Sequence, residues 1–150
     1  MSRVLILRNH QRVLRVNLPL LRQITRVLLQ DHVERDYFEL GIHLVSESDM
    51  IRLNETFLRH RGSTDVITFD YAEPPQRSPL SGEIFICVEQ AIAQSRRFHT
   101  TWQSELIRYL VHGLLHLCGY DDTTPRGFRA MHRMEDRLLT QLGLGKVFAG

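Results

Sequence analysis

Lysine is almost missing from this chain of 150 residues, since Lys146 is the only lysine among its 19 basic side chains. Cysteine is scarce as well, and two cysteines, Cys87 and Cys118, cannot form a disulfide framework. Both have apolar neighbours in the sequence, so we expect reduced side chains packed in the core. The contents of glycine (9), proline (5) and charged residues (24%) exclude a collagenous, low-complexity or disordered chain.

Long hydrophobic runs are also missing. No stretch reaches the roughly 20 apolar residues that a membrane span requires. The apolar run Val4–Leu7 is short and is followed by Arg8 and Asn9, so we expect no signal peptide. These absences predict a cytoplasmic protein without a membrane partner.

Acidic residues are lacking before Asp31, whereas the same segment contains six arginines: Arg3, Arg8, Arg12, Arg15, Arg22 and Arg26. Guanidinium groups bind phosphate through paired hydrogen bonds, so this segment suits nucleic acid. A solvated helix face in an arginine-rich protein is the other interpretation, and the net charge of +2 does not separate the two.

The length and the hydrophobic content of 43% predict one domain over residues 1–150, with a frayed tail at 143–150. A short buried strand is predicted at Val4–Leu7, and further strands are predicted at Phe38–Val45, Val66–Asp70 and Glu83–Val88. Arg12–Val16 either continues the first strand or pairs with it. Five helices are predicted: one capped by Asn17, one beginning near Ser46 and carrying Met50 to Leu58, then Glu89–Phe98, Trp102–Leu117 and Pro125–Leu142.

The alternation of strands and helices predicts an α/β fold of the α+β kind, with helices packed on a small mixed four-stranded sheet. The proline-rich loop Glu73–Ser81 joins two strands directly, so Val66–Asp70 can run antiparallel at an edge.

Two histidines on the helix Trp102–Leu117 carry the strongest chemical signal. On a helix His112 and His116 lie about 40° apart and one turn along the axis, so both imidazoles face one way. Gly119 can end the helix and turn the chain so that Asp122 returns toward the same point. Three such ligands with a fourth position left for water compose a catalytic zinc site, which we therefore expect on this central helix.

Other residues near this motif fit less well. Cys118 lies about 200° from His116 around the helix, so we interpret it as a packing residue. His132 on the last helix could face the metal, while the remaining histidines have no ligand spacing, although His60 could lie near substrate. Gly113 stands where peptidases with an H-E-x-x-H motif have their catalytic glutamate, which argues against proteolysis by that mechanism.

The segment from His112 to Asp121 reads H-G-L-L-H-L-C-G-Y-D and resembles the signature H-G-x-L-H-L-x-G-Y-D-H of the YbeY-type bacterial endoribonucleases. The resemblance extends to Leu53-Asn54, to T-D-V-I-T-F at Thr64–Phe69 and to G-E-I at Gly82–Ile84. It implies a zincin-like fold with one divalent metal ion, expected to be zinc. It also implies a single-strand-specific endoribonuclease that matures the 3′ end of 16S ribosomal RNA and serves ribosome quality control. The implied partners are the small ribosomal subunit and ribosomal or assembly-factor proteins.

The chain departs from the family pattern at two places. Asp122 replaces the third histidine, so the site would be His2Asp, and an anionic ligand should acidify a bound water less than a neutral imidazole would. The family also has Tyr-Arg and a proline before T-D-V, whereas this chain has Phe57-Leu58 and Ser63-Thr64. Arg59 or Arg61 could replace the family's cleft arginine only by displacement, and a solvated turn explains both equally well.

Sequence alone names no general base, and Asp121 and Glu83 are only candidates. For Thr64, Asp65 and Glu83 we expect structural roles at strand ends rather than support of the metal site. Glu135 and Met131 could back the site from the last helix, although core packing explains Met131 equally well. Two alternatives to the ribonuclease remain: a non-catalytic, zinc-containing ribosome-assembly factor and a metal-dependent hydrolase of another substrate.

Overall fold

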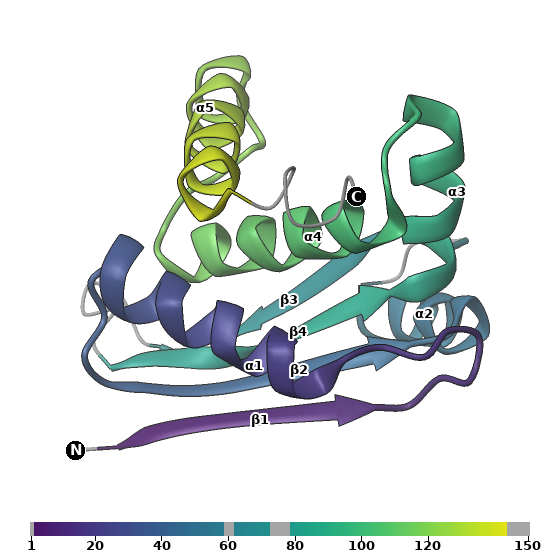
Figure 1. Cartoon of the computed structure of the whole chain (residues 1–150), viewed down its shortest axis with the longest axis horizontal. Helices are drawn as coiled ribbons and strands as arrows, with labels where there is room; N and C mark the ends of the chain where they lie inside the picture. The colour runs from purple at the N-terminus through teal and green to yellow at the C-terminus, as the bar shows by residue number, and fades with distance from the viewer. Residues whose placement is uncertain (1, 59–61, 73–78, 144–150) are drawn as a thin grey trace.

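A four-stranded sheet with the strand order β1-β2-β4-β3 underlies the fold (Figure 1). The computed structural model describes residues 2–58, 62–72 and 79–143. The strands are β1 (Arg3–Asn9), β2 (Phe38–Val45), β3 (Val66–Asp70) and β4 (Leu80–Cys87). The pairs β1–β2 and β2–β4 are parallel, and β3 runs antiparallel to β4 at the edge. The predicted mixed sheet with an antiparallel edge strand is therefore confirmed.

The described residues also form the five predicted helices: α1 (Leu18–Val27), α2 (Glu47–Leu53), α3 (Val88–Phe98), α4 (Trp102–Leu117) and α5 (Pro125–Leu142). Wider π-helical turns, Leu28–His32 and Asn54–Leu58, extend α1 and α2. Side chains cap four of the helices, because each accepts a hydrogen bond from a backbone N–H of the first turn; the capping residues are Asn17, Ser46, Thr101 and Thr124. Within the described residues, no helix combines the length and the apolar character needed to cross a membrane.

The helices α1 and α4 lie across one face of the sheet, and α5 stands against the end of α4 (Figure 1). Alternate residues of β4 point toward α4, which approaches very closely at Gly113. A Cβ atom on Gly113 would lie 2.8 Å from Cγ2 of Ile84, so only glycine fits there. This close approach places the second half of α4 directly over β4 and beside β3.

The other face of the sheet is covered only in part. There α2 contributes Met50 to a small buried cluster with Val45, Ile67 and Cys87. The rest of the core lies between the sheet and α1, α4 and α5, and its largest fully buried side chains include Ile42, Leu44, Ile84, Leu110 and Leu114.

Three predictions near the strands were wrong in detail. The strand Val4–Leu7 was expected to be buried, but Val4 and Ile6 are each 43% exposed because β1 is an edge strand with a helix on only one face. Arg12–Val16 forms no strand; the buried Gln11 instead bonds the backbone of Val13 and Leu14 and so stabilises a loop. β4 begins at Leu80, before the expected start at Glu83, while residues 73–78 of the predicted loop lie outside the described part.

Candidate metal centre

The carboxyl end of α4 carries two histidines and then reverses sharply. Gly119 adopts a φ of 103°, which side-chain-bearing residues rarely tolerate. The N–H of Gly119 bonds the carbonyl of His116 at 3.0 Å, and the N–H of Tyr120 bonds the carbonyl of Leu115 at 3.0 Å. This pair of bonds is a Schellman motif, which ends the helix and turns the chain back. The predicted helix stop at Gly119 is thus confirmed.

The reversal brings Asp122 to the two histidines. The ligand atoms of His112, His116 and Asp122 all lie within 4.8 Å of one another. The two Nε2 atoms are 3.1 Å apart, and the Asp122 carboxylate oxygens lie 3.5 Å from Nε2 of His112 and 3.7 Å from Nε2 of His116. The structure therefore brings together all three residues that the sequence predicted as metal ligands.

Each imidazole is held from behind through its Nδ1 atom. Nδ1 of His112 lies 2.9 Å from Oε2 of Glu135, and Nδ1 of His116 lies 3.1 Å from the carbonyl oxygen of Tyr120. A carboxylate and a carbonyl only accept hydrogen bonds, so both Nδ1 atoms carry the hydrogen. In the neutral rings both Nε2 atoms then present lone pairs to the same point.

The donor set fits a divalent metal ion. Two lone pairs facing each other at 3.1 Å repel unless a cation lies between them. Ligand atoms about 2.0–2.1 Å from a tetrahedral zinc ion are about 3.3 Å apart, close to the separations of 3.1, 3.5 and 3.7 Å found here. A histidine whose other nitrogen donates to a carboxylate is also the usual arrangement of a zinc ligand.

Glu135 connects this site to the interior. Its side chain is 2% exposed, and its Oε1 lies 3.7 Å from Nη1 of Arg108, which also bonds Asp136 at 3.1 Å. Burial lowers the pKa of His112, but the hydrogen bond and charge of Glu135, with the charges of Asp122 and Asp65, outweigh burial and raise that pKa. The negative charge around His112 thus favours a cation, either a proton or a metal ion.

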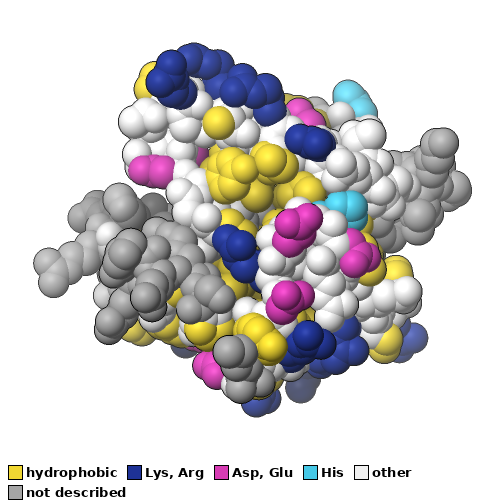
Figure 2. All heavy atoms as spheres, turned by 90° about the vertical axis from the view of Figure 1, so that its left-hand side faces the viewer, with side chains coloured by type: hydrophobic (Ala, Val, Ile, Leu, Met, Phe, Trp, Pro, Cys, Tyr) yellow, Lys and Arg dark blue, Asp and Glu magenta, His cyan; other side chains and the backbone are white. Residues whose placement is uncertain are grey.

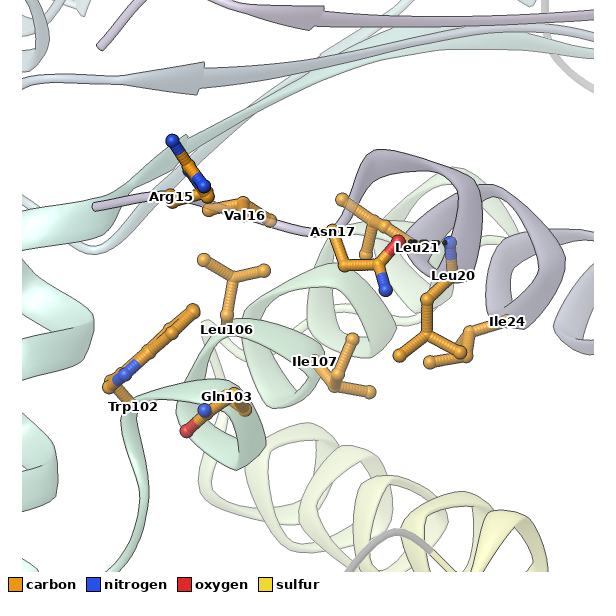
Figure 3. A pocket seen from close by; sticks show the side chains of 10 residues that line it. All are labelled: Arg15, Val16, Asn17, Leu20, Leu21, Ile24, Trp102, Gln103, Leu106 and Ile107. Carbon is orange, nitrogen blue, oxygen red and sulfur yellow. Dashed lines mark hydrogen bonds between the residues drawn. The ribbon is translucent and has the colours of Figure 1, made fainter. Parts of the chain in front are cut away.

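A cleft of about 320 Å³ opens beside the histidines. Its lining residues come from the edge strand, from α4 and from the turn after α2; they are Leu58, Val66, Ile67, Thr68, Asp70, His112 and His116. The side chains of His112, His116 and Asp122 keep 22%, 29% and 34% of their surface exposed, so a substrate in the cleft can reach them. A second hollow, of about 210 Å³, lies near the other end of α4 beside Trp102, and its described lining contains neither histidine nor carboxylate (Figure 3).

The two candidate general bases are engaged elsewhere. The Asp121 carboxylate accepts hydrogen bonds from the N–H and the hydroxyl of Thr123, and these bonds lower its pKa. Glu83 precedes Ile84, which faces α4, so its side chain lies on the opposite face of the sheet, where it bonds Tyr71 and His43. Glu83 therefore cannot act on a water molecule at the histidines.

The other singled-out residues have structural environments. Cys118 packs against the main core, as expected. The ring of the exposed His132 packs in a tilted arrangement against Phe128, with ring centroids 4.3 Å apart, and lies outside the ligand cluster. The Asp65 carboxylate accepts a hydrogen bond from the N–H of Val66 and so begins β3. Met131 is fully buried in the core. Arg59, His60 and Arg61 lie outside the described residues.

The sequence interpretation missed three contributors to the site. The Tyr120 carbonyl that holds His116 belongs to the backbone, and no residue type reveals it. Thr68 and Asp70 line the cleft, and strand alternation could have found them because they share a face with Val66.

Comparisons with known proteins identify similar sequences and a similar fold. The sequence pattern of the family described as Endoribonuclease YbeY matches residues 7–143. Two proteins named Endoribonuclease YbeY are similar over 106 residues: that of Bacteroides fragilis is 36% identical (71% of this chain, 74% of the relative), and that of Salinibacter ruber is 37% identical (67% and 68%). The solution structure of TM1509 from Thermotoga maritima is similar in fold, with a TM-score of 0.63 at 23% identity over 93% of this chain and 91% of that one.

Proposed function

This chain belongs to the endoribonuclease YbeY family, and from that membership we propose that it acts as a single-domain, metal-dependent endoribonuclease with His112, His116 and Asp122 as its metal ligands. The observation that carries the proposal is the convergence of three ligand side chains at the wall of an open cleft. In the described part of the chain, these three residues form the only cluster of histidine, cysteine or acidic side chains that could hold a metal ion. Three protein ligands leave a fourth coordination position for water, which is typical of catalytic rather than structural zinc sites.

The residues of this chain act mainly by positioning the metal ligands and the substrate. His112 and His116 present Nε2 lone pairs, which Glu135 and the Tyr120 carbonyl hold in place from behind. A divalent ion bound there supplies a Lewis acid that lowers the pKa of water and polarises a phosphoryl oxygen. In the cleft, Thr68 offers a hydroxyl donor for a phosphate oxygen, and Leu58 and Val66 offer an apolar wall for a base.

Peptide hydrolysis fits this site poorly. Peptidases with an H-E-x-x-H motif need a glutamate at the position of Gly113. Here a Cβ atom at that position would lie 2.8 Å from Ile84, so the helix packing leaves no room for such a side chain. The packing therefore argues against peptide hydrolysis by that mechanism.

The finer assignments rest on the same family membership. We take zinc as the metal, because two imidazoles and a carboxylate suit it. The RNA is single-stranded ribosomal RNA, cut at the 3′ end of the 16S molecule on or near the small subunit, in ribosome maturation and quality control. Ribosomal or assembly-factor proteins would then be its partners. Arg59 and Arg61 would contact phosphate near the cleft, so replacing either with alanine should cause a salt-sensitive loss of RNA binding.

One set of variants tests the proposal. Wild-type protein should contain one divalent ion and cut a single-stranded RNA that carries the 3′ region of 16S ribosomal RNA. His116→Ala or added chelator should lower cleavage by at least about 100-fold, because loss of a ligand exceeds the effect of losing a ligand's partner. His132→Ala is the matched control, since this exposed histidine lies outside the ligand cluster.

Measuring the metal content of variants tests the set of metal ligands independently of the RNA-cleavage activity. Asp122→Ala should weaken metal binding, and Asp122→His should retain or tighten it. Wild-type metal content in Asp122→Ala would remove Asp122 from the ligands. Cleavage that survives both His116→Ala and chelator would show that the activity belongs to another site. Bound metal without cleavage of RNA would favour a non-catalytic assembly factor.

A further inference from the structure

The outward side of α5 carries a row of four arginines, Arg126, Arg129, Arg133 and Arg137, which we call the α5 arginine row. Their spacing of three, four and four residues keeps them within about 80° of one another around the helix. All four are exposed. Figure 2 looks at the end of the molecule that carries α5, and dark blue basic side chains gather along the top of this view, where α5 lies.

Within the residues that the structure describes, no arginine of the row forms an ion pair, although Asp31 lines the same hollow as Arg137. Among the described arginines, ion pairs are found for Arg52 and Arg108. The two acids of α5 are engaged elsewhere, since Glu135 is buried against His112 and Asp136 bonds Arg108. The row therefore presents uncompensated positive charge.

The row does not help the helix to form. Like charges four residues apart repel one another, as do Arg129 and Arg133, and then Arg133 and Arg137. The first turn of α5 contains no acidic residue, so Arg126 and Arg129 also face the positive end of the helix dipole without compensation. Because the fold gains no stability from these charges, a polyanion that binds them is the simplest source of a favourable interaction.

The row begins close to the metal ligands along the chain, but it lies on the opposite side of α5 from Glu135. Arg126 follows the ligand Asp122 by four residues, and Glu135, about 180° around α5 from Arg126, holds His112. From Arg126 to Arg137 the row extends about 16 Å, which matches about five phosphates of a stacked strand at roughly 3.4 Å each. The Arg126 end of a strand bound along the row is therefore the end nearest to the ligand Asp122 along the chain.

We propose that the α5 arginine row is a second, sequence-independent binding surface for the sugar-phosphate backbone of RNA. The identification of the polyanion as RNA rests on the proposed function, whereas the existence of a surface that binds polyanions does not. The row holds RNA outside the cleft by neutralising phosphates and releasing their counterions.

The test measures binding of a fluorescently labelled, single-stranded RNA of about 20 nucleotides to full-length protein, with the integrity of the RNA checked afterwards. The variant Arg129→Gln/Arg133→Gln/Arg137→Gln removes three contacts of the row. Each phosphate contact contributes about 0.7 to the slope of log affinity against log salt, so the slope should fall by about 2 and the affinity at 0.1 M salt by about 100-fold. Arg133→Gln alone should lose about fivefold.

The matched control is Arg52→Gln/Arg96→Gln/Arg97→Gln, which removes the same charge from three exposed positions outside both α5 and the arginine-rich first 30 residues. We expect it to lose only a few-fold in affinity, and we expect the melting temperature of the row variant to equal or exceed that of wild type. Equal losses in the two triple variants would show that only net charge matters and would overturn the proposal. Unchanged RNA affinity in the row variant would overturn the proposal too. The same holds if the row variant loses binding to anionic lipid vesicles but keeps its affinity for RNA.

Cleavage assays keep the two proposals apart. If wild type cuts no RNA but its RNA affinity still depends on the row, the proposed function fails and the surface stands. If His116→Ala abolishes cleavage while the row variant binds RNA like wild type, the ribonuclease stands and the surface fails.

Discussion

Replacing Glu135 tests how strongly the metal ligands depend on one buried acid. Its side chain is 2% exposed and lies 2.9 Å from Nδ1 of His112. In Glu135→Gln the amide oxygen can still accept that hydrogen bond, but the negative charge that makes the imidazole a stronger ligand is lost. Second partners of this kind contribute about 10–100-fold to metal affinity, or about 1.4–2.7 kcal/mol. We expect Glu135→Gln to weaken zinc binding by that amount.

The alanine variant should do more. Glu135→Ala also removes the acceptor, so a largely buried Nδ1–H is left unpaired. An unsatisfied buried donor costs about 1–3 kcal/mol, and we expect the free energy of unfolding to fall by this amount without metal. The Arg108 guanidinium, 3.7 Å from Glu135, loses one of its two acidic neighbours at the same time.

Competition with a chromophoric zinc chelator between about pH 5 and pH 8 measures the effect. Glu135 raises the pKa of His112 in spite of its burial, so protons compete with metal more strongly in wild type as the pH falls. Glu135→Gln should therefore bind zinc more weakly near pH 8 but lose less of its affinity on acidification. This change in the shape of the pH profile separates an electrostatic role from simple loss of packing.

Glu105→Gln is the matched control, because Glu105 is also a buried glutamate, 8% exposed, and accepts a hydrogen bond from Thr100 at the start of α4. It should leave zinc affinity within about threefold of wild type. The reasoning is refuted if Glu135→Gln has wild-type affinity and a wild-type pH profile. It is refuted equally if Glu105→Gln weakens binding as much as Glu135→Gln does.

Two further predictions concern the sheet. The Tyr71 hydroxyl donates a hydrogen bond to Glu83 at 2.5 Å, and this bond raises the pKa of Tyr71 to about 12. The same bond, together with His43, lowers the pKa of Glu83, although burial of the carboxylate acts in the opposite direction. Tyr71→Phe should cost about 1 kcal/mol near pH 7, less than a buried charged hydrogen bond because Tyr71 is 58% exposed. That stability is present above the unfolded pKa of glutamate, near 4.3, and below that of tyrosine, near 10; it is lost as the pH falls through the lowered pKa of Glu83 or rises through about 12. Urea unfolding at pH 3 and pH 7 checks this, and an equal difference at both values would contradict it. Gly113→Ala should lower the free energy of unfolding by about 1–3 kcal/mol, because the Cβ atom of the alanine would force α4 away from Ile84. The same displacement of α4 should reduce the amount of bound metal. An unchanged urea midpoint in this variant would contradict the close packing at Gly113.

The secondary structure was predicted best where local signals mark the element ends. The bounds Phe38–Val45, Val66–Asp70, Trp102–Leu117 and Pro125–Leu142 are confirmed as expected. The last helix, for example, begins with the capping Thr124 and a proline, and both act within a few residues. Burial of β1 could not be predicted in the same way. Its exposure depends on the sheet order, which places it at an edge through contacts with β2, distant in the sequence.

The same distinction between local signals and contacts of distant segments applies to the candidate site. His112, His116 and Asp122 lie within one short segment, so helix geometry and one glycine turn were enough to bring them together in prediction. From the sequence, Glu135 could be named only as a residue that could back the site, because its contact with His112 depends on how α5 crosses α4, which no local pattern specifies. Glu83 illustrates a signal that was available but unused, because alternation along β4 places it opposite the inward-facing Ile84.

The charges of the site explain why the arginines matter. Asp122 and Glu135 bring two negative charges close to His112, and Arg108 offsets part of the charge of Glu135 from behind. A divalent ion in this His2Asp site would therefore be largely neutralised, more than it would be by three imidazoles. A nearly neutral centre attracts a polyanion weakly, so the positive potential that draws RNA must come from residues outside it. The uncompensated arginines on the outer side of α5 supply such a potential on the same helix that positions His112.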